Sequence, residues 1–365
     1  MNLKILATAD LHLGMRFSAY PEVQTKLSEA RFQTLNRLVQ TANREQCHLL
    51  VIAGDLFDRL KTPQEQIVRA VELINEFQGN LAAVLPGNHD YYGGSSGTLW
   101  KTFREHIGDR VLVLDSMQSY DLAHYGLKAR LYPGPCHSKY SKVDAVSWIA
   151  ANRKDAFNIG VAHGSIDGVT PDTAGSYFPM RRSELEKLGL DLWIVGHTHT
   201  VPQQDSGSLY LPGCPEPDGF DCRHTGQALI LELDEGGKIN ARTVNTGVYR
   251  FYREEIDLGR DCEISTVFDR FKTAGFERAL LKLAVKGRLS KPDRAVLNTA
   301  IEQLGRSAFW ARIDDSEVGE EITSGTVEAE FTQGSFPYRL LEKLIEEGDL
   351  DTLQAAYDLI QEASR

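Results

Sequence analysis

The feature that most constrains this chain is a repeated order of short apolar runs, each followed at once by a cluster of polar residues. Five such runs occur in the first 200 residues: Leu3–Ala7, Leu49–Ala53, Leu81–Leu85, Asn158–Ala162 and Leu192–Val195. Runs of this length favour strands that are buried on both faces. Between them, apolar residues recur at helical spacing, as in residues 35–42 and 67–77. Alternating strands and helices predict an α/β domain.

The sequence changes character after about residue 205. Residues 229–233 and 239–244 flank a Gly-rich turn and predict a hairpin, and residues 250–256 predict a further strand. Beyond them, apolar runs at 280–286 and 308–313 and C-terminal leucines at helical spacing predict a smaller α+β domain. A chain of 365 residues is long enough for two domains. We predict them to be residues 1–257 and residues 258–365.

Each apolar run of the first domain is followed by residues of the types that bind metal ions in proteins. These residues come just beyond the carboxyl ends of the predicted strands, where open α/β sheets build ligand sites. Asp10 and His12 are two residues apart, so they point to the same side of an extended chain. His197 and His199 have the same spacing. The candidate ligands are Asp10, His12, Asp55, Asn88, His163, His197 and His199.

This ligand set predicts a pair of metal ions. Carboxylates, imidazoles and an amide suit hard or borderline divalent ions such as Mn²⁺, Fe²⁺ or Zn²⁺. Seven ligands are too many for one tetrahedral zinc ion and suit two ions that share a bridging carboxylate. Each motif alone has a simpler interpretation, since Gly-Asp is a common turn and a single histidine often belongs to a hydrogen-bonded core. Five motifs in order, each at a strand end, are poorly explained as turns.

Together these motifs resemble those of the calcineurin-like metallophosphoesterases, over residues 1 to about 250. They are Asp10-Leu11-His12, Gly54-Asp55-Leu56-Phe57-Asp58, Gly87-Asn88-His89-Asp90, His163 and Gly196-His197-Thr198-His199. The second of them, with the opening Thr8-Ala9-Asp10-Leu11-His12-Leu13-Gly14, is similar to the SbcD branch of bacterial DNA-repair exonucleases, nuclease subunits of double-strand-break repair complexes. The resemblance implies two packed β-sheets flanked by helices, and a capping domain in residues 258–365.

The resemblance also implies which ion each ligand holds. The ligands of the first ion would be Asp10, His12 and His199. Those of the second would be Asn88, His163 and His197. Asp55 would bridge the two ions. Mn²⁺ is the expected metal, with Fe²⁺ or Zn²⁺ as alternatives.

Catalytic roles also follow from the resemblance. His89 would be the general acid that protonates the leaving oxygen, and Asp90 would orient its ring. Asp58 stands where some relatives carry an imidazole, so its role stays open. The loop Pro212–Glu216 replaces a Pro-Gly-Ser stretch of relatives and is equally open.

The net charge of −11 argues against a protein that coats DNA without regard to sequence. Charge is nevertheless uneven, since cations predominate over residues 128–154 and acids over residues 314–330. Solvated surface explains both runs; if DNA binds, it should contact the first run and avoid the second. The candidate substrate contacts are Arg16, Tyr91 and Tyr92, which are equally explicable as loop or core residues.

The expected function is therefore that of a metal-dependent DNA exo- or endonuclease in DNA repair. The resemblance implies a coiled-coil ATPase partner of the SbcC type, and homodimers are frequent in this branch. The alternative is a phosphodiesterase acting on cyclic nucleotides or nucleotide diphosphates, although such substrates do not require a capping domain. A scaffold with a vestigial metal site is a third alternative, which the intact ligand set disfavours.

Cysteine usage and hydropathy indicate a reducing, aqueous compartment. Five cysteines without a C-x-x-C pair predict free thiols, although Cys214 and Cys222 are close enough in sequence to be metal ligands or a redox pair. No apolar run approaches the length of a membrane span, and the first twelve residues do not form a signal peptide. We therefore expect a cytoplasmic protein that does not bind membranes.

Overall fold

The computed structural model describes residues 2–94, 97–150, 156–200, 207–222, 224–258 and 263–363. The chain packs into two compact units. Unit 1 runs up to Phe251 and includes Arg278–Leu280, and unit 2 comprises Tyr252–Glu277 and the residues from Leu281 onward. The domain boundary at 257/258 remains a prediction, and residues 259–262 beside it lie outside the described residues.

Unit 1 contains a six-stranded sheet in the order β11-β10-β1-β2-β3-β4. Its strands are β1 (Leu3–Thr8), β2 (Leu49–Ala53), β3 (Leu81–Leu85), β4 (Val111–Val113), β10 (Gln227–Leu233) and β11 (Ile239–Asn245). Strands β1 to β4 pair in parallel. The hairpin β10–β11 joins them antiparallel to β1, with Ile5 opposite Leu231. The predicted hairpin is thus confirmed.

A second, five-stranded sheet of unit 1 has the order β5-β6-β7-β8-β9. Its strands are β5 (Tyr120–Asp121), β6 (Ala129–Gly134), β7 (Phe157–His163), β8 (Leu192–Gly196) and β9 (Leu209–Tyr210). Strands β6 to β9 pair in parallel, with His163 opposite Gly196 at the carboxyl ends of β7 and β8. Both sheets therefore present several parallel carboxyl ends.

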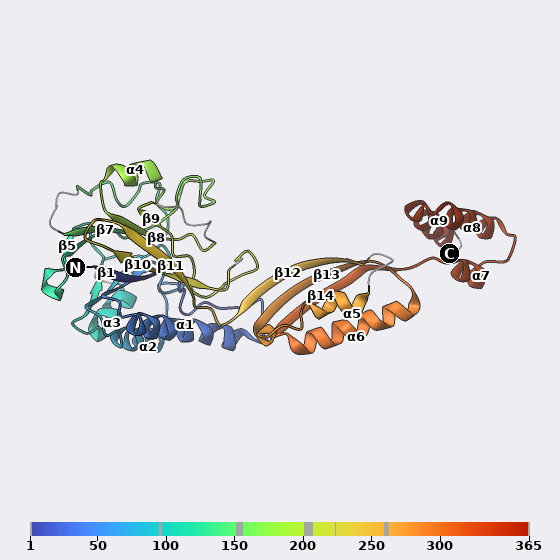
Figure 1. Cartoon of the computed structure of the whole chain (residues 1–365), viewed down its shortest axis with the longest axis horizontal. Helices are drawn as coiled ribbons and strands as arrows, with labels where there is room; N and C mark the ends of the chain where they lie inside the picture. The colour runs from blue at the N-terminus through green and yellow to red at the C-terminus, as the bar shows by residue number, and fades with distance from the viewer. Residues whose placement is uncertain are drawn as a thin grey trace. The chain divides into compact units, whose positions relative to one another are not determined.

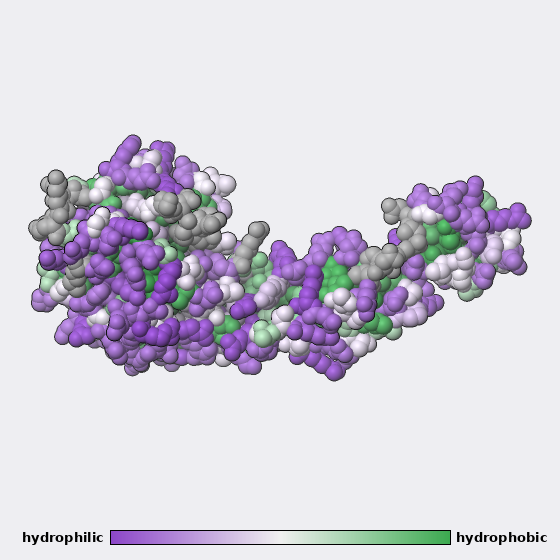
Figure 2. All heavy atoms as spheres, viewed as in Figure 1, coloured by the Kyte–Doolittle hydropathy of each residue, from purple (hydrophilic) through white to green (hydrophobic). Residues whose placement is uncertain are grey.

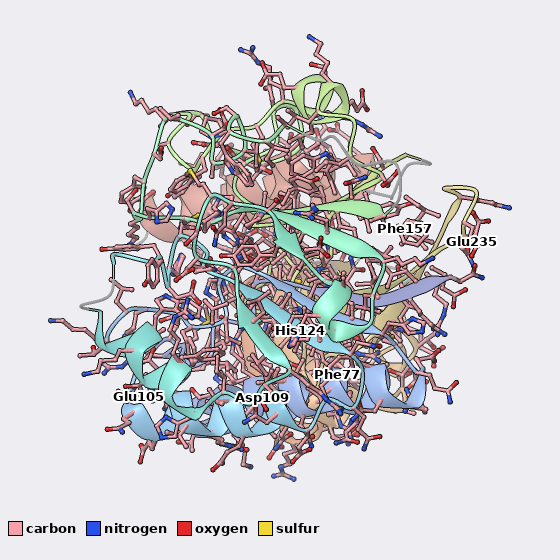
Figure 3. The ribbon with its side chains drawn as sticks, turned by 90° about the vertical axis from the view of Figure 1, so that its left-hand side faces the viewer. Phe77, Glu105, Asp109, His124, Phe157 and Glu235 are labelled. Carbon is pink, nitrogen blue, oxygen red and sulfur yellow. The ribbon has the colours of Figure 1, made fainter. Side chains whose placement is uncertain are left out.

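The two sheets lie face to face between helices, as Figure 3 shows from one side of unit 1. The helices are α1 (Gln24–Arg44), α2 (Gln64–Asn75), α3 (Thr98–His106) and α4 (Arg182–Lys187), with a 3₁₀ turn at Ala123–Tyr125. Alternation along each strand assigns its side chains to different layers. In β1, Leu6 packs against α1–α3, whereas Ile5 packs against the second sheet. In β8, Ile194 faces the first sheet and Trp193 packs beneath α4. These layers confirm the α/β fold with two packed sheets.

Unit 2 contains a three-stranded sheet, β12-β13-β14, and several helices (Figure 1). The strands are β12 (Arg250–Leu258), β13 (Ala279–Leu289) and β14 (Trp310–Glu320). The helices are α5 (Ile264–Asp269), α6 (Lys291–Ser307), α7 (Ser324–Glu330), α8 (Phe336–Glu347) and α9 (Leu350–Ala363), with a 3₁₀ turn at Phe276–Arg278. Leu341, Val327 and Leu353 form a small core among α7, α8 and α9. Unit 2 is thus an α+β region with a helical C-terminal part.

Hydrophilic side chains cover much of the visible face of unit 1 (Figure 2). Within the residues that the structure describes, no helix combines the length and the hydropathy that a membrane span requires.

Candidate metal centre

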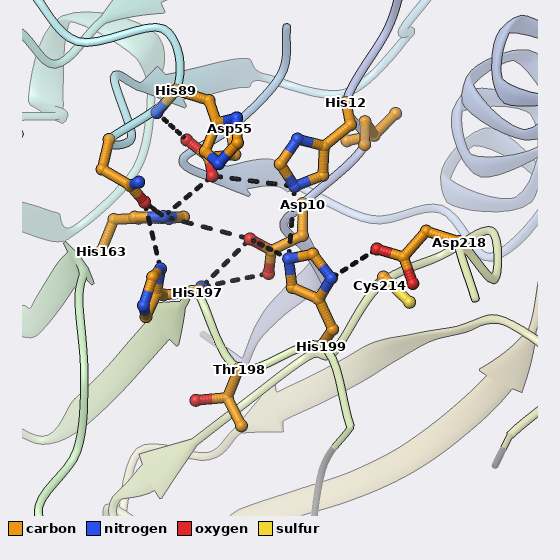
Figure 4. Close-up of polar contacts among 12 residues, drawn as sticks. Asp10, His12, Asp55, His89, His163, His197, Thr198, His199, Cys214 and Asp218 are labelled. Atoms are coloured by element: carbon orange, nitrogen blue, oxygen red, sulfur yellow. Dashed lines mark hydrogen bonds and ion pairs between the residues drawn. The ribbon is translucent and has the colours of Figure 1, made fainter. Parts of the chain in front are cut away.

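The polar residues that follow the buried strands converge on one site, drawn in Figure 4. Three loops after β1, β2 and β3 contribute from the first sheet, and the ends of β7 and β8 contribute from the second. We call the group the strand-end cluster: Asp10, His12, Asp55, Asn88, His163, His197 and His199. All seven predicted ligands are brought together. Most are fully buried, with His199 exposed by 31% of its side chain.

Backbone geometry at this site departs from the usual preferences. Asp10, His12, Asp55 and His197 have positive φ angles of 56°, 46°, 52° and 88°. Left-handed backbone is uncommon for residues other than glycine, and it persists where the surroundings enforce it. Here the Asp10 amide donates to the Gly54 carbonyl at 3.1 Å, and the His12 amide donates to the Asp55 carbonyl at 2.9 Å. The loops therefore hold their ligands in a preset arrangement.

Two glycines permit the close approach of these loops. A Cβ atom on Gly54 would lie 2.1 Å from Nδ1 of His163, and one on Gly87 would lie 2.2 Å from Oδ1 of Asp55. Gly54 also has a φ of 93°. Any side chain at either position would displace a candidate metal ligand. Steric crowding therefore explains why each motif has a glycine there.

One half of the cluster centres on Asn88. Its Oδ1 lies 3.0 Å from Nε2 of His163 and 3.0 Å from Nδ1 of His197. The other ring nitrogen of His163, Nδ1, lies 2.9 Å from the Ala53 carbonyl, to which it donates. A metal-binding histidine usually donates its second N–H to such an oxygen, which fixes the ring and its tautomer.

The other half centres on His12 and His199, whose Nε2 atoms lie 3.2 Å apart. Oδ1 of Asp10 lies 3.6 Å from Nε2 of His199. Ligands of one ion at about 2.1 Å stand about 3 Å apart, so these separations fit a divalent cation. Nδ1 of His12 is buried without a hydrogen-bond partner among the described residues.

Asp55 stands between the two halves. Its Oδ2 lies 3.7 Å from Nε2 of His12 and 3.3 Å from Nε2 of His163. Its Oδ1 accepts the backbone amide of His89 at 2.8 Å. One carboxylate thus faces both groups of nitrogen ligands, the position that a bridging ligand requires. The cluster contains carboxylate, imidazole and amide donors without a thiolate, which fits a pair of hard or borderline ions.

Burial and mutual charge shift the pKa values within the cluster in different directions. Burial raises the pKa of Asp10 to about 6. Burial also disfavours charge on His163, yet the carboxylates of Asp55 and Asp10 outweigh it and raise its pKa to about 9. Burial opposes ionisation of Asp55, but the neighbouring imidazoles, His163 foremost, hold its pKa well below the ordinary value. The carboxylates of Asp10 and Asp55 therefore stabilise positively charged groups within the strand-end cluster.

His89 lies beside this cluster. Its ring contacts that of His12 edge-on at 4.7 Å. Its Nδ1 lies 3.0 Å from the backbone carbonyl of Asp58 and donates to it. Sequence reasoning left the role of Asp58 open. In the structure, the backbone carbonyl of Asp58 is the group that orients the His89 ring.

The expectation that Asp90 orients the His89 ring is wrong. The carboxylate of Asp90 is buried and accepts the amides of Gly87 at 2.7 Å and Phe57 at 3.0 Å. Burial and the nearby charge of Asp55 raise its pKa to about 7. Asp90 therefore links the turn after β3 to the loop after β2 through the two amides that its carboxylate accepts, while Nδ1 of the His89 ring contacts the Asp58 carbonyl.

Two supporting residues were missed by sequence reasoning. Asp218 Oδ2 lies 2.6 Å from Nδ1 of His199, and with Asp10 it raises the pKa of His199 to about 10 against the effect of burial. Arg31 of α1 is buried and donates to the Leu11 carbonyl at 2.7 Å, behind the first loop. Neither lies in a recognisable motif. The only sequence signal was that Asp218 follows the Pro212–Glu216 loop.

The predicted substrate contacts lie in different surroundings. Arg16 lines a cavity of about 530 Å³ that also includes Arg59 and Lys61. Tyr91 packs against a small core cluster, and Tyr92 packs against the core formed with α1–α3. In the basic run 128–154, Arg130 is paired with Asp121. Residues 151–154 of that run, including Arg153 and Lys154, lie outside the described residues.

Comparison with known families agrees with this site. The family model named calcineurin-like phosphoesterase matches residues 3–201, more than half of the chain. The chain belongs to this family, whose members hydrolyse phosphoesters at a dimetal site, and the candidate metal-binding groups lie where such a site is required.

Individual relatives are more distant. The uncharacterized metallophosphoesterase YhaO of Bacillus subtilis is 25% identical over an alignment of 304 positions, which covers 78% of this chain and 69% of that protein. The DNA double-strand break repair protein Mre11 of Methanopyrus kandleri is 25% identical over an alignment of 372 positions, which covers 95% of this chain and 76% of that protein. One of the subunits of the nuclease SbcCD of Escherichia coli K12 is 37% identical over 95 residues, 24% of this chain and 21% of that protein.

Proposed function

We propose that this phosphoesterase hydrolyses phosphodiester bonds of DNA, as a Mn²⁺-dependent exo- or endonuclease in DNA repair. The position of Asp55, which faces both halves of the strand-end cluster and holds the His89 amide at 2.8 Å, supports the two-metal phosphodiester chemistry. The choice of DNA as substrate is supported by the similarity to Mre11 and SbcCD proteins. Similarity to an Mre11 protein extends over 95% of the chain and so includes unit 2. Similarity to part of the nuclease SbcCD supports an SbcC-like ATPase as the partner.

The residues of the chain divide the chemistry among them. Two divalent ions, held by the strand-end cluster, would supply Lewis acidity and an activated water near neutral pH. His89 would donate a proton from Nε2 to the leaving 3′ oxygen of the sugar. The Asp58 carbonyl would keep the ring in the tautomer that this transfer requires. Asp90 would hold the two loops that carry Asp55 and His89 in register.

A basic cavity beside the site suits the backbone of a nucleic acid. Its charged lining residues are the cations Arg16, Arg59, Lys61 and Arg69 and the acids Glu29 and Glu65, and Arg69 pairs with Glu29. Arg59 pairs with Asp58, whose carboxylate lies 3.9 Å from Nδ1 of His12, so the cavity adjoins the strand-end cluster. Phosphate contacts of this kind position a DNA strand without reading its bases. Arg16 and Lys61 would supply local positive charge to a DNA strand in a chain whose net charge is −11.

Hydrolysis of labelled linear DNA, measured beside hydrolysis of bis-p-nitrophenyl phosphate, tests the proposal. We expect both activities with Mn²⁺, their loss with EDTA, and their loss in an Asp10→Ala variant, which excludes a contaminating nuclease. Cleavage of the small diester with intact DNA would contradict the DNA proposal and favour a small-molecule phosphodiesterase. Repeating that assay with an SbcC-like ATPase separates this result from a simple requirement for the partner.

A further inference from the structure

A second group of metal-binding side chains lies outside the strand-end cluster, in the loop between β9 and β10. It consists of Cys214, Cys222 and His224, which we call the loop cluster. Their ligand atoms all lie within 4.8 Å of one another. Cys214 is fully buried and Cys222 is exposed by only 2%. Figure 4 shows Cys214 beside Asp218 and His199, so the loop cluster adjoins the strand-end cluster.

The separations within the loop cluster match a tetrahedral site. Bonds of about 2.3 Å to sulfur and 2.0–2.1 Å to nitrogen give tetrahedral edges of about 3.8 Å between sulfurs and about 3.5 Å between sulfur and nitrogen. The two sulfurs lie 3.6 Å apart. Nδ1 of His224 lies 3.8 Å from the Cys222 sulfur, close to the tetrahedral edge. Nε2 of the same ring lies 3.4 Å from the Cys222 sulfur and 4.0 Å from the Cys214 sulfur. A disulfide would instead need the sulfurs at about 2.05 Å.

The surroundings of His224 suit a metal ligand. Its Nε2 lies 2.8 Å from the His199 carbonyl and donates to it, which is the usual partner for the second nitrogen of a ligating histidine. Its Nδ1 then carries the lone pair, which accepts the Gly226 amide at 3.1 Å and which a metal ion would take over. The Cys214 amide donates to the same His199 carbonyl at 3.3 Å. The loop cluster is therefore attached to the backbone of a predicted dimetal ligand.

We propose that Cys214, Cys222 and His224 bind a thiophilic divalent ion, Zn²⁺, at a third metal site separate from the dimetal centre. Two thiolates and an imidazole favour Zn²⁺ over the hard ions that suit the strand-end cluster. Three protein ligands leave the fourth tetrahedral position to water. The ion would fix the loop that carries Asp218 and that holds His199 by its carbonyl. This inference does not depend on the substrate of the phosphoesterase.

Cobalt substitution tests the site without an activity assay. Thiolate ligands give Co²⁺ an intense near-ultraviolet charge-transfer absorption, and the strand-end cluster contains no thiolate. We expect the full-length protein, purified under reducing conditions and loaded with Co²⁺, to show this band. We expect Cys222→Ser and His224→Asn to lose it together with about one equivalent of bound zinc. The band should persist in Cys47→Ser, which removes a buried thiol of the α1–β2 region, and in Asp10→Ala.

Several results would overturn the proposal. A wild-type protein without the band would do so, as would a band that survives in both Cys222→Ser and His224→Asn. A Cys214–Cys222 disulfide found by mass spectrometry in metal-free protein, purified under reducing conditions, would replace the metal site with a redox pair. If the variants fail to fold, titration of wild-type thiols with an organomercurial decides, because the proposal requires stoichiometric zinc release as Cys214 and Cys222 react. Loss of DNA cleavage alone bears only on the proposed function.

Discussion

The strand-end cluster and the loop cluster hold similar side chains by different means. In the strand-end cluster, ladder hydrogen bonds fix each strand, and ligands from two sheets meet where parallel strands end. In the loop cluster, the positions of Cys214, Cys222 and His224 depend on one loop and its contacts with His199. The first arrangement is rigid before any ion binds. In the loop cluster, the loop is held only once the contacts of Cys214, Cys222 and His224 have formed. The loop cluster is therefore suited to support the strand-end cluster.

This difference predicts the largest effects for ligands of the strand-end cluster, and the largest of all for Asp55. Asp55→Asn should lower phosphodiester hydrolysis by about 1,000-fold or more, because a metal ion supplies several kcal/mol of transition-state stabilisation. Metal content, measured on the same protein, should fall with activity. Asp109→Asn, at an exposed carboxylate, serves as the control. A normal metal content and rate in Asp55→Asn would remove Asp55 from the bridging position.

The next effect separates catalysis from metal binding. His89→Ala should bind metal normally and lose at least about 100-fold in the rate of DNA cleavage, the usual scale of general acid catalysis. Bis-p-nitrophenyl phosphate releases a leaving group that needs little protonation, so its hydrolysis should fall much less. The measurement is the loss of rate on each of the two substrates in the same His89→Ala variant. Equal losses for both substrates would mean that His89 positions the phosphate instead of protonating the leaving oxygen.

Asp218 connects the two clusters and should give a smaller effect. Asp218→Asn removes the carboxylate on Nδ1 of His199, and loss of such an outer partner costs about 10- to 100-fold in metal affinity or activity. Metal titration followed by activity at saturating metal would distinguish affinity from rate. Asp221→Asn, an exposed neighbour in the same loop, should behave like the wild type. If the two variants behave alike, the contact with His199 has no role in metal binding.

The same comparison explains what the sequence could predict. Asp55 and His163 were predictable because a polar residue at the end of a buried strand has its position set by the sheet. Asp218 and the loop cluster were not, because loop residues meet through tertiary contacts that leave no regular spacing. Asp90 was misassigned for the same reason: its neighbour in sequence, His89, turns toward Asp58, while its own carboxylate serves the loop amides.

The protonation of histidines in the metal-free site predicts how metal affinity depends on pH. The pKa of His163 is raised to about 9 and that of His199 to about 10, so both carry a proton near neutral pH. A metal ion must displace these protons, because only the neutral imidazole is a ligand. Apparent metal affinity should therefore fall as pH falls below about 9, about tenfold per pH unit for each proton displaced. Calorimetry in buffers of different ionisation enthalpy would count the protons released. Binding without proton release would contradict the assignment of these histidines as ligands.

The smallest expected effect lies outside both clusters, at the basic cavity. Arg16→Ala and Lys61→Ala should each weaken DNA binding and reduce the slope of log affinity against log salt by about 1, because each side chain would neutralise one phosphate. Binding is best measured with Asp10→Ala as the parent, which keeps the DNA intact. Lys101→Ala, on the exposed face of α3, should leave the slope unchanged. Hydrolysis of the small diester should also stay the same in Arg16→Ala and Lys61→Ala, because that substrate has no flanking phosphates for these cations to neutralise. Equal losses on the small diester would mean that these cations support the loops around His12 and Asp58, and the path of DNA would then have to be sought on another face of unit 1.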